Sequence, residues 1–177
     1  MAGSLIKVDE FTISSPVASV ILGGANWDSS YDVYKVVVNN VSPATANIFR
    51  ARITKDVTGT PTPQTTTNYD FALKRFKTSG IFENNYNSNQ NYIDVTDSFV
   101  NASTGNANLI MYIFNANNSS EYTFATTEVS QYTYAPSLRG QQGGFVFTVA
   151  SAVDGINFFT NADNFASGTF TLYGLAK

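Results

Sequence analysis

The sequence predicts an all-β fold, an antiparallel β-sandwich of jelly-roll type with about ten strands. Three observations lead to this prediction. Apolar and polar residues alternate along short segments that are rich in β-branched and aromatic side chains. Apolar residues at helical spacing are almost absent. Turn signals built from Gly, Asn and Pro separate the segments. A β-barrel is the alternative architecture.

The strands follow from this alternation, one segment at a time. The expected strands cover residues 5–13, 17–22, 32–40, 47–54, 69–78, 92–99, 108–115, 121–129, 143–150, 155–160 and 167–175. The Thr- and Pro-rich stretch 58–67 is expected to form a surface loop, and the glycines of 140–144 are expected to form a turn. We find no internal repeat and no linker. Residues 1–177 are therefore expected to form a single sandwich domain, with 1–15 as an arm or an edge strand.

The expected strand 32–40 is apolar on nearly both faces, because Val33 and Val37 alternate with Tyr34 and Val36. A strand of this kind is central in its sheet or is covered by a neighbouring subunit. Tyr34 is therefore a candidate interface residue.

The composition argues for a folded protein with a surface low in charge. Charged residues make up 13%, against about 25% in typical domains. Hydrophobic residues at 43% and aromatic residues at 14% argue against disorder. Because the cores of protein interfaces are depleted in charge, this surface favours contact with another protein. A low-charge domain without a partner is the alternative.

Charge and hydropathy argue against two kinds of partner. The net charge is −3 and no basic stripe is present, so we expect no nucleic acid to bind. No segment approaches the roughly 20 apolar residues that a membrane helix needs. The first residues lack a basic region followed by an apolar run, so we expect no secretory signal and no membrane insertion.

The chain has no Cys and no His. This composition removes thiolate nucleophiles, imidazole bases, disulfides and the usual zinc sites. A glycosidase needs only two carboxylates, and Asp94 with Asp97 is the nearest such cluster. For calcium, Asp28 with Asp32 could add ligands, but no dense acidic loop is present. We therefore expect no enzyme, no catalytic residue, no metal and no cofactor.

The Asn-rich segment 83–91 is a candidate contact loop. The amides of Asn84, Asn87 and Asn89 could hydrogen-bond sugar hydroxyls, and Tyr86 could stack on a sugar ring or anchor a protein interface. A solvated loop whose Asn residues only cap turns is the alternative.

Trp27 is a second candidate contact residue. It follows the turn signal at 23–26 and is the single Trp of the chain. It could be a ligand platform, an anchor at the rim of an interface, or a side chain buried against the edge of the sandwich.

Two runs carry a resemblance to a known family. The first is YDVYKVVVNNV at 31–41, followed by PAT at 43–45. The second is VDGINFF at 153–159, followed by NFASGTFTLYG at 164–174. With the opening LIK they resemble small virion structural proteins of aquatic tailed bacteriophages, of the decoration or tail-fibre-like kind. The resemblance implies a β-sandwich or jelly-roll subunit, made in the host cytoplasm and located in the virion. It also implies a homotrimer whose partners are phage capsid or tail proteins.

Three hypotheses about function follow. The first is a capsid decoration (cement) protein that stabilises the particle exterior through protein–protein contacts. The second is a receptor- or carbohydrate-binding module of a tail fibre or tail tip, with segment 83–91 and Trp27 contacting a host surface glycan. The third is an enzyme acting on host polysaccharide through Asp94 or Asp97. Copy number per particle separates the first two.

Overall fold

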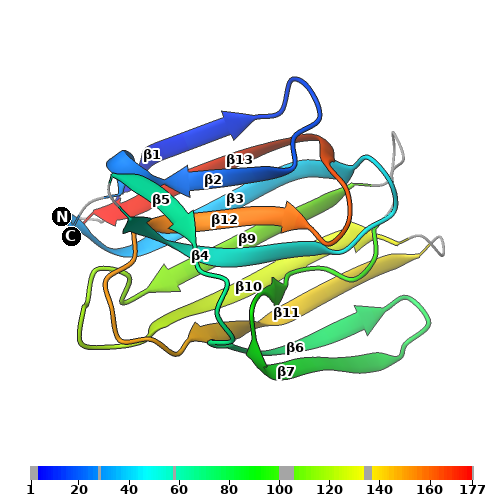
Figure 1. Ribbon diagram of the computed structural model, residues 1–177. Coiled ribbons are helices and arrows are strands. Elements are labelled where there is room, and N and C mark those ends of the chain that lie inside the picture. Colours follow the sequence, from blue (N-terminus) through cyan, green and yellow to red (C-terminus); the bar gives the residue numbers. More distant parts are fainter. Residues whose placement is uncertain (1–3, 28, 58, 100–105, 134–136, 177) are drawn as a thin grey trace.

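The chain folds into two antiparallel β-sheets packed face to face, which confirms the predicted all-β sandwich (Figure 1). The structure is a computed structural model and describes residues 4–27, 29–57, 59–99, 106–133 and 137–176. The first sheet has eight strands in the spatial order β1 (Leu5–Thr12), β13 (Phe165–Ala176), β3 (Tyr31–Pro43), β9 (Ala107–Phe114), β10 (Thr123–Tyr132), β11 (Leu138–Phe147), β6 (Tyr69–Lys77) and β7 (Phe82–Gln90). The second has the order β2 (Ser19–Gly23), β12 (Gly155–Thr160), β4 (Phe49–Val57) and β5 (Thr60–Pro63), with β8 (Ile93–Asp94) also paired to β4. A single turn of 3-10 helix, η1, covers Gly24–Asn26.

The connectivity is that of a jelly roll with an extension. Strands β1, β13, β3 and β9 face β2, β12, β4 and β5, and the chain crosses between the sheets from β1 to β2, from β2 to β3, from β3 to β4 and from β12 to β13. Strands β10, β11, β6 and β7 then widen the first sheet beyond β9 (Figure 1). The added strands place a broad sheet face on one side of the molecule. The segment 1–15, expected to be an arm or an edge strand, contains β1, which is the end strand of the first sheet.

Two segments predicted to be loops are strands instead. The stretch 58–67 contains β5, and the Asn-rich segment 83–91 lies almost entirely in β7. Both strands lie at sheet edges. An edge strand tolerates proline and needs no continuous apolar face, so its composition resembles that of a loop.

The glycine-rich stretch 140–144 is not a turn but lies inside β11. A Cβ atom on Gly143 would come 2.2 Å from the Ala72 carbonyl oxygen, and one on Gly144 would come 2.6 Å from that of Ala125. Glycine is therefore needed here because the neighbouring strands β6 and β10 approach the β11 backbone closely.

The predicted strand 92–99 is also mostly wrong, since only β8 pairs as a strand there. The predicted strand 143–150 begins five residues after the start of β11 and ends three residues beyond it. The other predicted strands agree with the structure to within three residues.

The core between the sheets is centred on Phe49 of β4, which is fully buried. Its ring centroid lies 5.3 Å from those of Phe158 in β12 and Phe165 in β13, and 6.1 Å from that of Phe170 in β13. The Phe99 ring follows at 6.4 Å. Because β4 and β12 belong to one sheet and β13 to the other, this aromatic cluster joins the two layers.

Replacing Phe49 by Ala is expected to lower the free energy of unfolding by about 3–5 kcal/mol, since it removes the ring shared by both sheets. Urea unfolding followed by tryptophan fluorescence measures this change. The matched control is Phe82→Ala, because Phe82 is 62% exposed and its loss should leave the midpoint almost unchanged. Equal effects of the two substitutions would contradict the central place of Phe49.

Candidate functional site

Trp27 and Tyr34 belong to the core. Their rings stack at a centroid distance of 3.7 Å and an angle of 15°, and Tyr31 packs edge-on against Tyr34 at 5.8 Å. Trp27 is 9% exposed and Tyr34 is fully buried. Of the three roles considered for Trp27, the buried one matches the structure. Burial removes both side chains from the surface of the fold, so neither is available as a contact residue.

The predicted contact residues of segment 83–91 lie along the edge strand β7. The Tyr86 side chain is 73% exposed. The Asn84 amide oxygen accepts a hydrogen bond from Lys74 at 2.9 Å. The other two Asn residues are used locally: the Asn87 side chain accepts from the Ser88 amide, and Asn89 takes φ 54°. Of these four residues, Tyr86 and Asn84 lie opposite Ala72 and Lys74 of β6 and share the outer face of the eight-stranded sheet with them.

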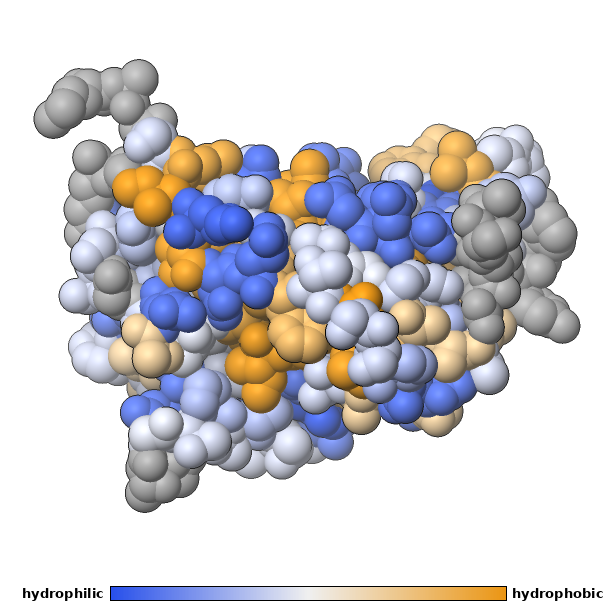
Figure 2. Space-filling model, turned by 90° about the horizontal axis from the view of Figure 1, so that it is seen from above, coloured by the Kyte–Doolittle hydropathy of each residue, from blue (hydrophilic) through white to orange (hydrophobic). Residues whose placement is uncertain are grey.

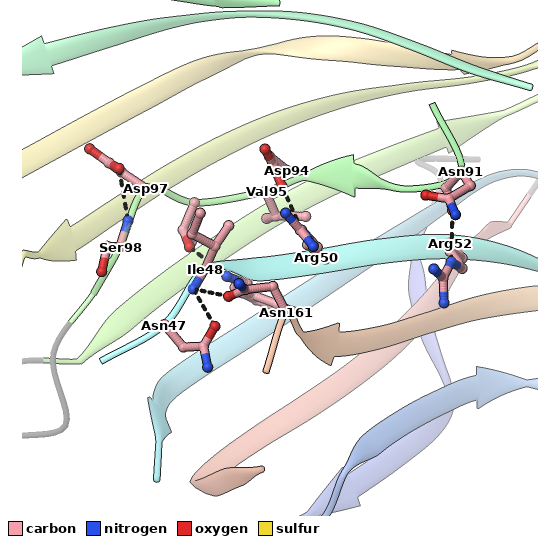
Figure 3. Close-up of polar contacts among 12 residues, drawn as sticks. Asn47, Ile48, Arg50, Arg52, Asn91, Asp94, Val95, Asp97, Ser98 and Asn161 are labelled. Atoms are coloured by element: carbon pink, nitrogen blue, oxygen red, sulfur yellow. Dashed lines mark hydrogen bonds and ion pairs between the residues drawn. The ribbon is translucent and has the colours of Figure 1, made fainter. Parts of the chain in front are cut away.

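The carboxylates considered for hydrolysis are paired with arginines. Asp94 accepts a hydrogen bond from Arg50 at 2.8 Å, and Figure 3 shows the two side chains pointing toward one another. Asp97 forms ion pairs with Arg75, at 3.8 Å, and with Arg139. Burial lowers the pKa of the Arg75 guanidinium. These pairs tie segment 91–99 to the sheets.

The described residues hold no cluster of three or more acidic, His or Cys side chains that could bind a metal ion. In the same part of the chain, no helix has the length and apolar character needed to span a bilayer. Asp28, which was considered with Asp32 as a source of calcium ligands, lies outside the described residues.

The candidate site is the outer face of the eight-stranded sheet, which is turned away from the second sheet. In an antiparallel sheet, residues directly opposite one another in neighbouring strands point to the same face and form a row across it. One such row is Tyr112 of β9, Thr126 of β10, Gly144 of β11, Ala72 of β6 and Tyr86 of β7. Its three central side chains are small and its ends are tyrosines. The row spans four strand spacings, or about 19 Å.

An apolar row borders this one on one side. It consists of Phe114, Phe124 and Val146, and it ends at Asp70. Side chains two positions apart along a strand share a face at a spacing of about 7 Å, so these residues form a wall beside the small central side chains. Phe124 is 46% exposed although it lies in the middle of a wide sheet. Exposed aromatic side chains in this position are typical of binding surfaces.

A hydrogen-bonding row borders the small residues on the other side. It consists of Glu128, Gln142, Lys74 and Asn84. The Gln142 amide donates to the Glu128 carboxylate at 3.0 Å, and Lys74 donates to Asn84 at 2.9 Å. One carboxylate, one ammonium group and two side-chain amides are thus held in place along this side.

The three rows form a shallow groove, which we call the trough. Its floor is Thr126, Gly144 and Ala72, with Tyr112 and Tyr86 at the ends. Hollows flank the floor on both sides. One of about 460 Å³ adjoins the apolar wall and is lined by Asp70, Phe71, Ala72, Phe114, Phe124, Ala125, Thr126, Gly144, Phe145 and Val146. Another of about 410 Å³ adjoins the polar wall and is lined by Ala72, Leu73, Lys74, Asn84, Tyr86 and Gln142.

Sequence reasoning missed most of the trough, although one signal was present. In the segment that forms β9, Leu109, Met111 and Ile113 are buried, while Ile110 and Tyr112 are exposed on the outer face. This segment is therefore apolar on both faces, which is the pattern that drew attention to 32–40. The small floor residues give no such signal, because Ala72 and Gly144 become neighbours only through strand pairing.

Comparisons with known proteins give no family for the chain. No protein-family model and no curated protein matches it. Among solved structures, the CBM2 module of the evolved Dit of Lactobacillus casei phage J-1 is similar at 10% identity and a TM-score of 0.25, with 90% of this chain and 69% of that chain covered. Alginate lyase from Alteromonas sp. 272 is similar at 9% identity and a TM-score of 0.19, with 89% and 76% covered. TM-scores this low do not establish a common fold.

Replacing Asp97 by Ala is expected to lower the free energy of unfolding by about 1–3 kcal/mol, because it leaves the partly buried Arg75 and Arg139 without their shared carboxylate. Thermal unfolding measures the effect. Glu121→Ala, which removes an exposed carboxylate from the segment before β10, is the control and should have little effect. An unchanged stability of the Asp97 variant would show that the two ion pairs are not structural.

Proposed function

We propose that this chain is a non-catalytic binding protein of a phage particle and that the trough binds an extended host glycan. The observation that carries the proposal is the layout of the outer face: an apolar aromatic wall and a hydrogen-bonding wall stand on opposite sides of a floor of small side chains. The virion context comes from the sequence resemblance at 31–45 and 153–174.

The chemistry of a glycan chain matches this layout. Each sugar ring has an apolar face of C–H groups and an edge of hydroxyls that both donate and accept hydrogen bonds. The C–H face can pack on Phe124 and on the end tyrosines, while the hydroxyls meet Glu128 and Gln142. The trough is also open and several strands long, which suits a chain of sugars better than a single one.

Among the two locations considered, this site favours a receptor- or carbohydrate-binding module of a tail fibre or tail tip. In that location a glycan-binding face has a direct use, because the tail makes the first contact with the host surface. The contact residues differ from those expected from sequence. Tyr86 and Asn84 remain, and Tyr112 and Phe124 take the place of Trp27.

A separate observation supports the capsid decoration hypothesis as a second candidate. Apolar side chains gather where the β6–β7 hairpin meets the start of β11. Phe76 and Phe82 pack edge-to-face at 5.6 Å, and Ile81 and Leu138 are more than half exposed. An exposed apolar cluster of this kind suits contact with a coat or tail protein. The decoration hypothesis predicts a copy number per purified particle comparable with that of the coat protein, whereas a tail component is present in few copies.

Replacing Tyr112 by Ala is expected to weaken glycan binding by about tenfold or more, because an aromatic platform at one end of the trough is lost. A panel of purified bacterial polysaccharides and lipopolysaccharides on an array identifies the bound glycan, and calorimetric titration measures the affinity. Tyr132→Ala is the matched control, since Tyr132 is an exposed tyrosine on β10 away from the floor.

Replacing Ala72 by Arg is expected to abolish the same binding without unfolding the protein, because the long side chain fills the floor while Phe71 and Leu73 keep their places in the core. Circular dichroism checks the fold. Binding that survives both Tyr112→Ala and Ala72→Arg would exclude the trough as the glycan site.

Absence of binding to any glycan, together with capture of purified coat protein, would favour decoration. Release of reducing ends from a bound polymer would contradict a non-catalytic role.

A further inference from the structure

The end strand β1 differs from the other edges of the two sheets. In the described part of the chain, β5 carries Pro61 and Pro63, and β7 is polar at seven of its nine positions. The prolines discourage pairing of β5 with another chain, and β7 offers few apolar side chains for such pairing. The remaining edge of the second sheet, β2, has only five residues. Strand β1 has eight residues and leaves Leu5, Ile6 and Phe11 exposed at 46%, 44% and 40%. Figure 2 views the molecule from the β1 and β2 side, where hydrophobic and hydrophilic areas alternate.

The side chains of β1 are divided between the two faces of the sheet by their partners in β13. Lys7 lies opposite Tyr173 and Glu10 opposite Thr171, so both point to the outer face. Ile6 lies opposite Gly174 and therefore points to the inner face. The pairing register with β13 shifts between Lys7 and Asp9, so Val8 is the extra, unpaired residue of β1. This shift brings Asp9 and Phe11 to the inner face.

The charged side chains of β1 differ in how they lie at the sheet edge. Asp9 is turned toward β2, where its carboxylate accepts a hydrogen bond from the Gly23 amide at 2.9 Å. Lys7 and Glu10 remain exposed at the edge and lie 3.4 Å apart. A single edge therefore presents one positive and one negative group, placed symmetrically about the Val8–Asp9 step.

We propose that β1 pairs antiparallel with β1 of a second copy of this chain, with Lys7 opposite Glu10 and Ile6 opposite Phe11 of the other copy. The two-fold axis passes between Val8 and Asp9. The pairing makes two Lys–Glu pairs on the outer face and two Ile–Phe pairs on the inner face. The same patch is used on both copies, as in any isologous dimer.

This register is the one in which the faces and the charges both match. A shift by one residue would place an inner side chain opposite an outer one along the strand. A shift by two would restore the faces but would separate Lys7 from Glu10.

The dimer would join the two eight-stranded sheets edge to edge. Because Lys7 and Glu10 point to the outer face in both copies, the outer faces of both sheets lie on the same side. Two copies of the trough would then face a surface together, and linked sites bind a repeating ligand more tightly than single ones. The pairing itself does not depend on what the trough binds.

Charge reversal with cross-mixing tests the proposal. The wild-type chain should sediment as a dimer that dissociates on dilution. Lys7→Glu or Glu10→Lys alone should raise the dissociation constant by about tenfold, because each places like charges opposite one another twice. Mixing the two variants in equal amounts should restore a heterodimer, since the glutamate introduced in one copy then faces the lysine introduced in the other. The double variant Lys7→Glu/Glu10→Lys should dimerise like the wild type.

The mixing step separates pairing between copies from effects within one chain. Each single variant also loses its internal Lys7–Glu10 contact, but mixing cannot repair that loss. Glu121→Lys, an equal charge change at an exposed position of the segment before β10, is the control and should leave the dimer unchanged. Circular dichroism verifies that all variants fold. A monomer at every concentration, the homotrimer that the sequence resemblance implies, or a dimer that mixing does not restore would each overturn the proposal.

Discussion

The two sheets differ in width, and the rest of the structure depends on how this mismatch is accommodated. Four strands of the first sheet lie over the second sheet around the Phe49 cluster, as in an ordinary jelly roll. The four added strands need another cover on their inner side. Segment 91–99 provides it, with Val95 and Phe99 buried and with Asp97 held between two arginines. The buried Gln141 side chain of β11 donates a hydrogen bond to the Val95 carbonyl, which fixes this cover to the added strands.

The outer side of the added strands has no such cover. The added strands β10, β11 and β6, and β9 beside them, bury one set of side chains and leave the alternate set facing outward, and that set includes Phe124 and Tyr112. Burial of the inner set stabilises the fold. The outer set is consequently free to serve binding, and its arrangement into an apolar row, a small row and a polar row follows directly from strand register.

The fold class and most strands could be predicted from the sequence because burial imposes an alternation that is visible locally. The failures occurred where burial is not the deciding constraint. Strand β7 carries few apolar residues because it is an edge, and the glycines of β11 reflect close approach of neighbouring backbones and not a turn. Tyr86 and Asn84 of the proposed site could be selected from their local composition. The partnership of Gly144 with Ala72 could not, since it depends on pairing between strands about 70 residues apart in sequence.

The floor of the trough has a consequence for how such a protein can change over time. Ala72 and Thr126 project outward between core residues, so substitutions there alter the shape of the groove while the packing beneath is kept. Gly144 has no such freedom, because any side chain would collide with the Ala125 carbonyl. For the glycan-binding role proposed above, the shape of the groove can therefore change at Ala72 and Thr126 while Gly144 is kept, without loss of a stable fold.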